Sequence, residues 1–416
     1  MAVLQFLPVE LLRQILADLD PVSLRKISLV SHLFNTLAEP FHYHSLGHSS
    51  DVQVQSRGWL LPILFTLVTR PEMARYVRCI TFWYWAERYP TPDNCILFSA
   101  KAAELGIRDI GWWDDAQALF LLHLVPDVQE LHFNDTPLLR TYLEQTIGTP
   151  IADVPFQSLL KFTNHSPVTL RMLLAAMRLP SMRSIQVSMP YNQDYSHDPI
   201  VDSIIAFAGQ SSVTHLTLHT GDTSNSILQL ILQMPRELTS LSYMYDREYG
   251  LVTDMPPMHT VLEHVRPALR SLSIGGLYAI GLPEPCEVQI GSLRNWPALT
   301  TLNCSLPALL GSRQNPTGRL VDLLPLGIRR LFLWRKDEHS SMVKSREQWN
   351  VWQMTEQLVE VLQNRSLDHL TVNTCARVYI PKKGMWKEGW FNQYEERVKQ
   401  RLTAAVGTRR CKIACF

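Results

Sequence analysis

One short apolar pattern recurs along most of the 416-residue chain and limits the folds open to it. It consists of an apolar residue, two others, an apolar residue, one other and a third apolar residue. Its nine copies begin at Val77, Val128, Met182, Val213, Leu238, Leu269, Leu299, Ile328 and Leu367. From the third copy to the eighth, the steps are 31, 25, 31, 30 and 29 residues. One copy could arise by chance, but nine at a near-constant step indicate a repeat.

Each copy predicts one β-strand, followed by a helix or loop before the next copy. Alternation would send residues such as Leu216 and Leu218 into a core, and parallel strands would stack into a horseshoe with the intervening residues on its concave face. The step lies at, and slightly beyond, the upper end of the leucine-rich-repeat range of about 20–29 residues. An ordinary α/β domain with a parallel sheet is the alternative.

The repeat therefore predicts an α/β fold class, with a solenoid over 76–380 and a C-terminal cap over 381–416 that covers the last core layer. We expect a looser copy at 156–162 and one long helix at 100–124, as an insertion or an irregular second repeat. A connecting helix is expected at 59–68, within a connector over 49–75. Further helices are expected at 167–179, 199–210, 224–234, 349–363 and 395–403, and a last strand at 412–416.

The first fifty residues carry more leucine and isoleucine than so short a segment can bury by itself. They predict three short helices. Pro8 suits the first turn of one helix, Asp20 and Pro21 form an N-cap and first-turn pair, and Ser31 can cap the third until Pro40 bends or stops it. The surplus apolar surface therefore predicts a contact with another protein or with the rest of the chain.

Two stretches in this segment carry a family pattern. They read Leu-Pro-x-Glu-Leu-Leu-x-x-Ile-Leu-x-x-Leu-Asp-Pro-x-Ser-Leu from Leu7 and Ser-Leu-Val-Ser-x-x-Phe-x-x-Leu-Ala from Ser28. Their order and spacing resemble the F-box, with two departures: Ser31 stands where a cysteine is frequent, and Phe34 where a tryptophan is frequent. The resemblance places an F-box over 1–48, and the loose repeats that follow are similar to those of fungal members. The alternative is a helical cap on the following domain.

The resemblance implies a function. F-boxes dock on a Skp-family adaptor and, through it, join a cullin-RING ubiquitin ligase. We expect the adaptor side to include Leu7, Pro8, Leu11, Ile15 and Val30, as buried apolar anchors. The chain would be the substrate-recognition subunit of an SCF-type ligase and would itself catalyse nothing. A scaffold that binds the adaptor without directing degradation is the alternative.

The client, whose identity the sequence leaves open, would bind the concave face of the solenoid. Residues between the inward-facing ones are small and polar in the middle of the chain and aromatic at both ends. Aromatic residues and arginine dominate interface energies, so Arg330, Phe332, Trp334 and Trp83 are the expected client contacts. The alternative is that flanking loops cover these side chains.

Composition narrows the partners and the compartment. Hydrophobic residues make up 46% and charged residues 19% of a chain with net charge +1, which describes a folded protein without the basic stripe of a nucleic-acid binder or a membrane-surface patch. No signal-peptide pattern and no apolar run of about 18 residues occurs, so we expect a cytoplasmic or nuclear protein that does not enter a membrane.

No motif predicts a catalytic site, a cofactor or a metal. The seven cysteines are scattered, which argues against a disulfide framework. His42, His44 and His48 form a local cluster whose spacing is weak for zinc, and Cys411 and Cys415 fit small apolar residues of a capping strand better than metal ligands or a redox pair.

Overall fold

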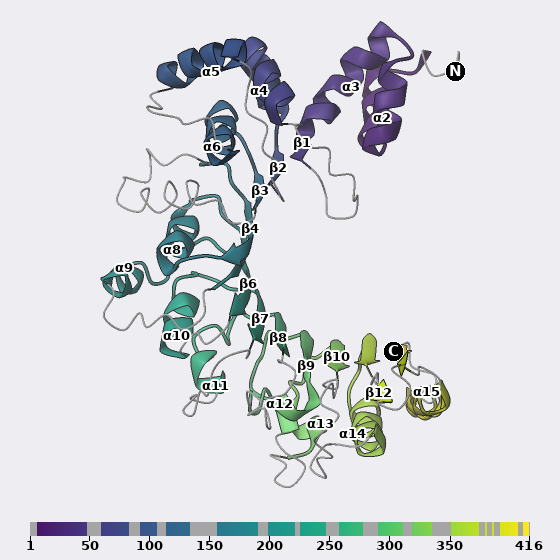
Figure 1. The fold of residues 1–416 in the computed structure, drawn as a ribbon. Coiled ribbons are helices and arrows are strands. Elements are labelled where there is room, and N and C mark those ends of the chain that lie inside the picture. The colour runs from purple at the N-terminus through teal and green to yellow at the C-terminus, as the bar shows by residue number, and fades with distance from the viewer. Residues whose placement is uncertain are drawn as a thin grey trace. The chain divides into compact units, whose positions relative to one another are not determined.

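The computed structural model describes residues 6–47, 60–82, 92–105, 114–133, 156–189, 199–220, 225–246, 258–277, 290–310, 318–334, 351–373, 379–380, 385–386, 392–406 and 411–415. It forms two compact units, residues 1–187 and 188–416, each described by itself (Figure 1).

The first unit begins with three helices whose starts are set by capping residues. They are α1 (Val9–Ala17), α2 (Pro21–Ser28) and α3 (His32–His44). The Asp20 carboxylate accepts the backbone N–H groups of Val22 and Ser23 at 2.9 and 3.0 Å, and the Ser31 hydroxyl accepts that of Phe34 at 3.3 Å. Both predicted caps are present. Pro40 was expected either to bend or to stop the third helix. It does not stop it, because α3 continues to His44.

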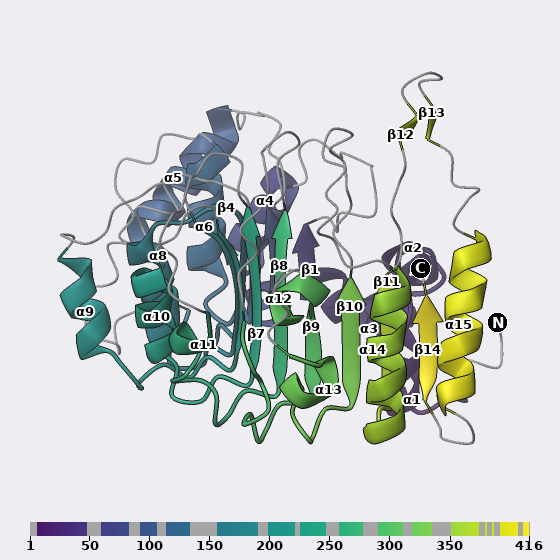
Figure 2. The same ribbon diagram turned by 90° about the horizontal axis from the view of Figure 1, so that it is seen from below.

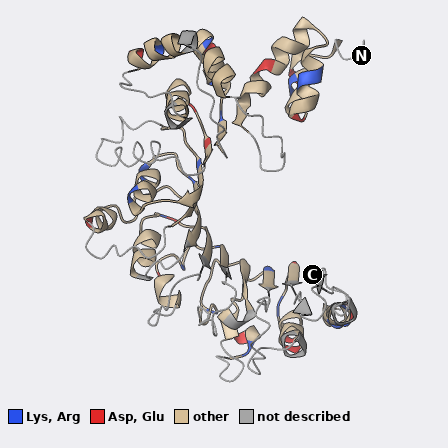
Figure 3. Ribbon diagram, in the orientation of Figure 1, with Lys and Arg blue, Asp and Glu red and all other residues tan. Residues whose placement is uncertain are grey.

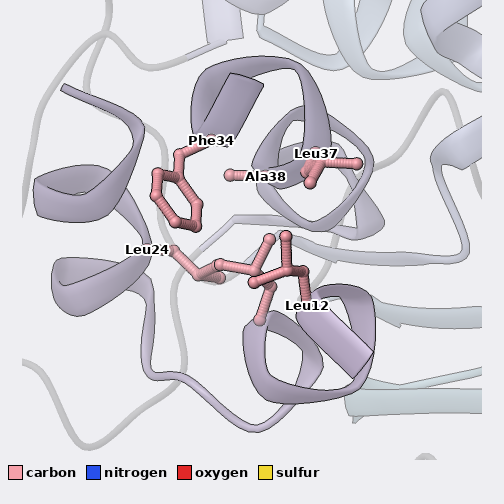
Figure 4. Packing of buried hydrophobic residues seen from close by; sticks show 6 residues of the cluster. Leu12, Leu24, Phe34, Leu37 and Ala38 are labelled. Carbon is pink, nitrogen blue, oxygen red and sulfur yellow. The ribbon is translucent and has the colours of Figure 1, made fainter. Parts of the chain in front are cut away.

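A small apolar core holds these helices together. Leu12 and Leu16 of α1 meet Leu24 of α2 and the buried side chains of α3 (Figure 4). Those from α3 are Phe34, Leu37 and Ala38. The partly buried side chains of Leu7, Leu19, Ile27 and Phe41 pack around this cluster. The helical segment therefore builds its own core from one face of each helix.

The remainder of the first unit alternates strands with helices. Its elements are β1 (Ser45–Gly47), α4 (Leu60–Thr69), the 3-10 helix η2 (Pro71–Tyr76), β2 (Cys79–Phe82), α5 (Pro92–Glu104), α6 (Asp114–Leu124), β3 (Glu130–Phe133), β4 (Lys161–Pro167), α8 (Leu170–Arg178) and β5 (Ser184–Ser188). The strands are neighbours in chain order, and β1 to β4 pair in parallel.

The second unit continues the same plan. Its elements are α9 (Ile200–Ala206), β6 (His215–Thr220), α10 (Asn225–Gln233), β7 (Ser240–Asp246), α11 (Met258–Val261), β8 (Ser271–Leu277), β9 (Thr301–Ser305), α12 (Leu306–Leu310), α13 (Leu320–Leu323), β10 (Arg330–Trp334), α14 (Val351–Asn364), β11 (His369–Asn373), β12 (Tyr379–Ile380), β13 (Met385–Trp386), α15 (Asn392–Val406) and β14 (Lys412–Cys415). Strands β6 to β11 and then β14 pair in parallel, and helices α10 to α14 lie along one side of them (Figure 2).

All nine copies of the apolar pattern coincide with strands of this solenoid-like parallel sheet. Wherever their side chains are described, the three apolar residues of each copy are buried, as in Val213, Leu216 and Leu218.

One backbone contact also recurs between repeats. The N–H groups of the first strand residue and of the residue before it both donate to one carbonyl of the preceding repeat. Thr300 and Thr301 donate to Arg270 in this way, and Arg329 and Arg330 to Thr300. The repeats are therefore structurally equivalent at their strands.

Three features differ from the sequence-based expectation. The looser copy is Leu159, Phe162 and Asn164 rather than a run from 156 to 162, because a buried asparagine takes the third apolar place. Two helices, α5 and α6, replace the single long helix expected at 100–124; α5 ends at Glu104, and residues 106–113 lie outside the described part. Strand β1 was not predicted, since Leu46 is its only apolar residue.

Strand β14 and helix α15 lie where the cap was expected. Ile413 and Cys415 of β14 align with Leu370 and Val372 of β11, so the last strand extends the parallel sheet. Helix α15 packs against α14 and β14 and buries Val398. The hairpin of β12 and β13 is a separate two-stranded sheet.

Candidate adaptor-binding site

An apolar stripe on α1 remains exposed beside the buried one. Leu12 and Leu16 fill the core, whereas Leu11 and Ile15 are 44% and 39% exposed to solvent. The two exposed residues are four positions apart, so they lie one turn apart on the same helix face. Neither residue belongs to the buried core cluster of the three helices or to the partly buried side chains packed against it.

The other expected adaptor contacts fall into two groups. Pro8 is exposed just before α1, and Val30 is exposed at 41% just before α3. Leu7 differs, because its side chain is half-buried against the three-helix core. Leu7 therefore has a packing role whether or not it touches a partner.

Further apolar side chains are exposed in the same three-helix segment. They include Phe6, Val9, Val22, Leu29 and Leu33. Leu33 is not among the adaptor contacts expected from the sequence. The signal was present, since Leu33 lies one residue before Phe34 and so on a different helix face. Several exposed apolar side chains within so short a segment are candidates for a partner-binding surface.

Two neighbouring cations lie in the last turn of α2. Arg25 and Lys26 lie there, where the negative end of the helix dipole favours cations (Figure 3). Burial of His42 on α3, together with the neighbouring Arg25 charge, lowers the pKa of its imidazole. His42 is therefore neutral near pH 7.

Helix α3 runs directly into the sheet. It ends at His44, whose carbonyl accepts the Arg78 N–H at 2.9 Å, and Ser45 of β1 then pairs with Cys79 of β2. Arg70, next to η2, binds Glu39 of α3 at 2.7 Å. Both side chains are partly exposed, so this ion pair is worth at most about 1 kcal/mol, and the backbone pairing is the firmer connection.

Comparison with known families decides the nature of the three-helix segment. Residues 4–48 match the F-box-like family model, which covers α1 to α3 and ends just after β1. The chain carries an F-box-like domain. The match confirms the resemblance seen in the sequence, and it extends to none of the strands from β2 onward. No curated protein matches the chain significantly.

The F-box-like domain implies a partner. F-box domains bind Skp-family adaptors within SCF-type ubiquitin ligase complexes, and F-box proteins are in general non-catalytic substrate adaptors. The exposed stripe of Leu11 and Ile15 lies inside the matched residues. In the part of the chain that the structure describes, no helix is both long enough and apolar enough to cross a membrane.

The residues expected to contact a client lie outside the F-box-like domain. Arg330 is exposed and Phe332 half-buried on β10, and the Phe332 ring lies 5.3 Å from the ring of His369 on β11. Trp334 ends β10, and its backbone pairs with Asn373, but its side chain is outside the described part. Trp83 is also outside the described residues.

The structure also tests the side chains considered as metal ligands. His42 is half-buried and His44 exposed on α3, His48 lies outside the described residues, and Cys411 is half-buried before β14. A different group converges on the sheet of the first unit: the ligand atoms of Cys79, Glu130 and His132 all lie within 4.8 Å of one another. Sequence reasoning did not single out this group, although aligning the first two repeats places Cys79 opposite Glu130.

Proposed function

We propose that this protein is the substrate-recognition subunit of an SCF-type ubiquitin ligase. The observation that carries the proposal is the apolar stripe of Leu11 and Ile15, which is exposed next to a complete core within an F-box-like domain. An apolar stripe left outside a finished core favours a protein partner. The adaptor would cover this stripe together with Pro8, Val30 and the exposed edge of Leu7.

The rest of the chain would select the client. We propose the division inferred from the sequence: an F-box over 1–48, a connector over 49–75, an irregular leucine-rich-repeat solenoid over 76–380 and a cap over 381–416. The strand face opposite the helices supports this role, since it presents polar side chains that a partner can hydrogen-bond. Asn303 already donates to the Ser273 hydroxyl at 3.1 Å across two repeats of that face.

Client contact is proposed for Arg330, Phe332, Trp334 and Trp83. Support comes from the exposed Arg330 and the half-buried Phe332 on adjacent outward positions of β10. An arginine beside an aromatic ring is a typical hot-spot combination. The subunit would act by raising the effective concentration of a client beside the ligase, without catalysis of its own. We propose a cytoplasmic or nuclear location, and no nucleic-acid or membrane partner.

Capture on an immobilised Skp-family adaptor tests the first half of the proposal. The wild-type chain is expected to bind, and the variant Leu11→Asp/Ile15→Asp is expected to lose binding while its circular dichroism stays unchanged. Matched replacement of two exposed apolar residues elsewhere, Ile205→Asp/Leu326→Asp, should leave capture intact. Failure of the wild type to bind, or equal binding by all three proteins, would contradict the adaptor role.

Proximity labelling in cells tests the second half. Proteins labelled by the wild type but not by Arg330→Ala/Phe332→Ala are candidate clients, and their abundance should rise when the adaptor-binding stripe is charged. Stable client levels under that change would favour the alternative, a scaffold that uses the F-box-like domain for adaptor binding without directing degradation. Client capture unaffected by the β10 variant would remove these residues from the client surface.

A further inference from the structure

Three side chains of different chemistry meet on one face of the sheet in the first unit. Cys79 lies on β2, and Glu130 and His132 lie on β3. The parallel register pairs Cys79 with Glu130, and alternation turns Ile80 and Leu131 to the opposite, buried face. The thiol, carboxylate and imidazole therefore project from neighbouring strands into one small area, with all three ligand atoms within 4.8 Å of one another.

The spacing inside this group is compatible with a metal shell. The His132 Nε2 and Glu130 Oε2 atoms are 3.4 Å apart, which makes a long hydrogen bond in the absence of a metal. Two nitrogen or oxygen ligands with bonds of about 2.0–2.1 Å in a tetrahedral zinc shell are about 3.3 Å apart. The Cys79 Sγ atom, from the adjacent strand, lies within 4.8 Å of the Glu130 and His132 ligand atoms and supplies the third ligand.

The surroundings suit a bound cation of intermediate softness. All three residues are half-buried. An imidazole binds a metal through a ring nitrogen and a cysteine through its thiolate, so a bound metal would displace the thiol proton of Cys79. Lys161 Nζ lies 3.5 Å from the same Glu130 oxygen, so its ammonium group would compete with a metal for this carboxylate.

We propose that Cys79, Glu130 and His132 form a binding site for a divalent transition metal of the zinc class. A thiolate and an imidazole favour zinc-like ions over magnesium or calcium, which take oxygen ligands. Three protein ligands leave the fourth tetrahedral position to water or to a ligand from a partner. The ion would join β2 to β3, and β2 pairs with β1 at the end of the F-box-like domain. This inference is independent of the proposed ligase role.

Metal titration of the full chain tests the site. After treatment with a chelator, the wild type is expected to bind one zinc ion per chain, measured by competition with a zinc indicator. Cobalt(II) should then report the thiolate through a sulfur-to-metal charge-transfer band. Cys79→Ser, Glu130→Gln and His132→Ala should each weaken binding by at least about 10- to 100-fold, the loss typical of even an outer-shell partner. Cys79→Ser should also abolish the band.

Matched controls separate ligation from folding. Cys411→Ser and His369→Ala change a cysteine and a histidine outside the group, and should keep both the affinity and the cobalt band. Lys161→Met should tighten binding, because it removes a cation that competes for Glu130. Metal-free melting temperatures of all variants, compared with the wild type, identify any variant that fails to fold. Among folded proteins, a wild type without the thiolate band, or three site variants with wild-type affinity, would overturn the proposal.

Discussion

Leu11 and Leu12 are adjacent residues of α1 that face opposite environments. Leu12 is 2% exposed in the core of the F-box-like domain, whereas Leu11 is 44% exposed. Successive helix residues point about 100° apart, so one leucine can build the core while its neighbour faces outward. The sequence of α1 therefore carries two apolar stripes: Leu12 and Leu16 hold the domain together, whereas Leu11 and Ile15 are exposed, as the proposed adaptor contact requires.

This division predicts opposite effects of two alanine substitutions. Leu12→Ala should lower the free energy of unfolding of the F-box-like domain by about 2–5 kcal/mol, because it removes buried side-chain volume from a small core. Leu11→Ala should change it by about 0.5 kcal/mol or less, as surface substitutions usually do. Urea denaturation followed by helical circular dichroism measures both. Equal losses would mean that Leu11 is also a core residue.

The cap of α2 predicts a dependence of stability on pH. The Ser23 hydroxyl and the backbone N–H groups of Ser23 and Val22 lower the pKa of the Asp20 carboxyl below its ordinary value of 3.8. The carboxylate therefore stabilises the folded state above about pH 3.8, and this contribution is lost as the pH falls through the folded-state pKa. Asp20→Asn keeps a capping side chain but cannot titrate.

The difference in unfolding free energy between wild type and Asp20→Asn should thus stay constant near neutral pH and change below about pH 3.8. Asp20→Ala, which removes the cap, should be less stable than Asp20→Asn at every pH. Urea unfolding at a series of pH values measures these differences. If the difference in unfolding free energy between the wild type and Asp20→Asn stayed constant across the acid range, Asp20 would not carry the cap charge.

Gly47 at the end of β1 predicts a strong effect of a single methyl group. Its φ is +106°, and a Cβ there would collide with the Thr81 carbonyl oxygen of β2. Gly47→Ala should therefore cost more than the roughly 1–3 kcal/mol of a strained backbone alone. Gly209 is the matched control, since its φ is +68° with open space around a Cβ. Melting temperatures should fall more for Gly47→Ala than for Gly209→Ala; the reverse order would contradict the close β1–β2 approach.

The end of the sheet predicts a structural role for α15. Leu402 is fully buried on this helix, which packs against α14 and β14. Leu402→Ala should lower the unfolding free energy of the second unit by about 2–5 kcal/mol, whereas the exposed Gln400→Ala should have little effect. Hydrogen exchange of the β14 amides gives a second readout and should quicken only in Leu402→Ala. Unchanged exchange there would argue against a capping function.

Sequence reasoning worked where local patterns and stacking agree. The three apolar residues of a copy such as Leu299, Leu302 and Cys304 both alternate along a strand and stack on their neighbours, so each strand was visible in the sequence. The N-caps at Asp20 and Ser31 were visible for a similar reason, because their residue types have one dominant structural use.

The structural features that the sequence did not predict have physical causes. Strand β1 contains one apolar residue, Leu46, and is held by pairing with β2, which no local pattern predicts. Asn164 occupies an apolar position and satisfies its side-chain oxygen with the Ser166 N–H at 2.9 Å, so the copy at β4 was misaligned. Cys79 and Glu130 are far apart in the chain and become neighbours only through the register of β2 and β3.

The adaptor affinity of the α1 stripe is the most direct test of the functional account. Isothermal titration of a purified Skp-family adaptor into the wild type should show one-to-one binding. Leu11→Asp/Ile15→Asp should weaken it about 100-fold or more, because two apolar anchors each contribute about 2 kcal/mol. Ile205→Asp/Leu326→Asp should retain the wild-type Kd. A wild type that does not bind, or a folded Leu11→Asp/Ile15→Asp variant that binds as tightly as the wild type, would contradict the account.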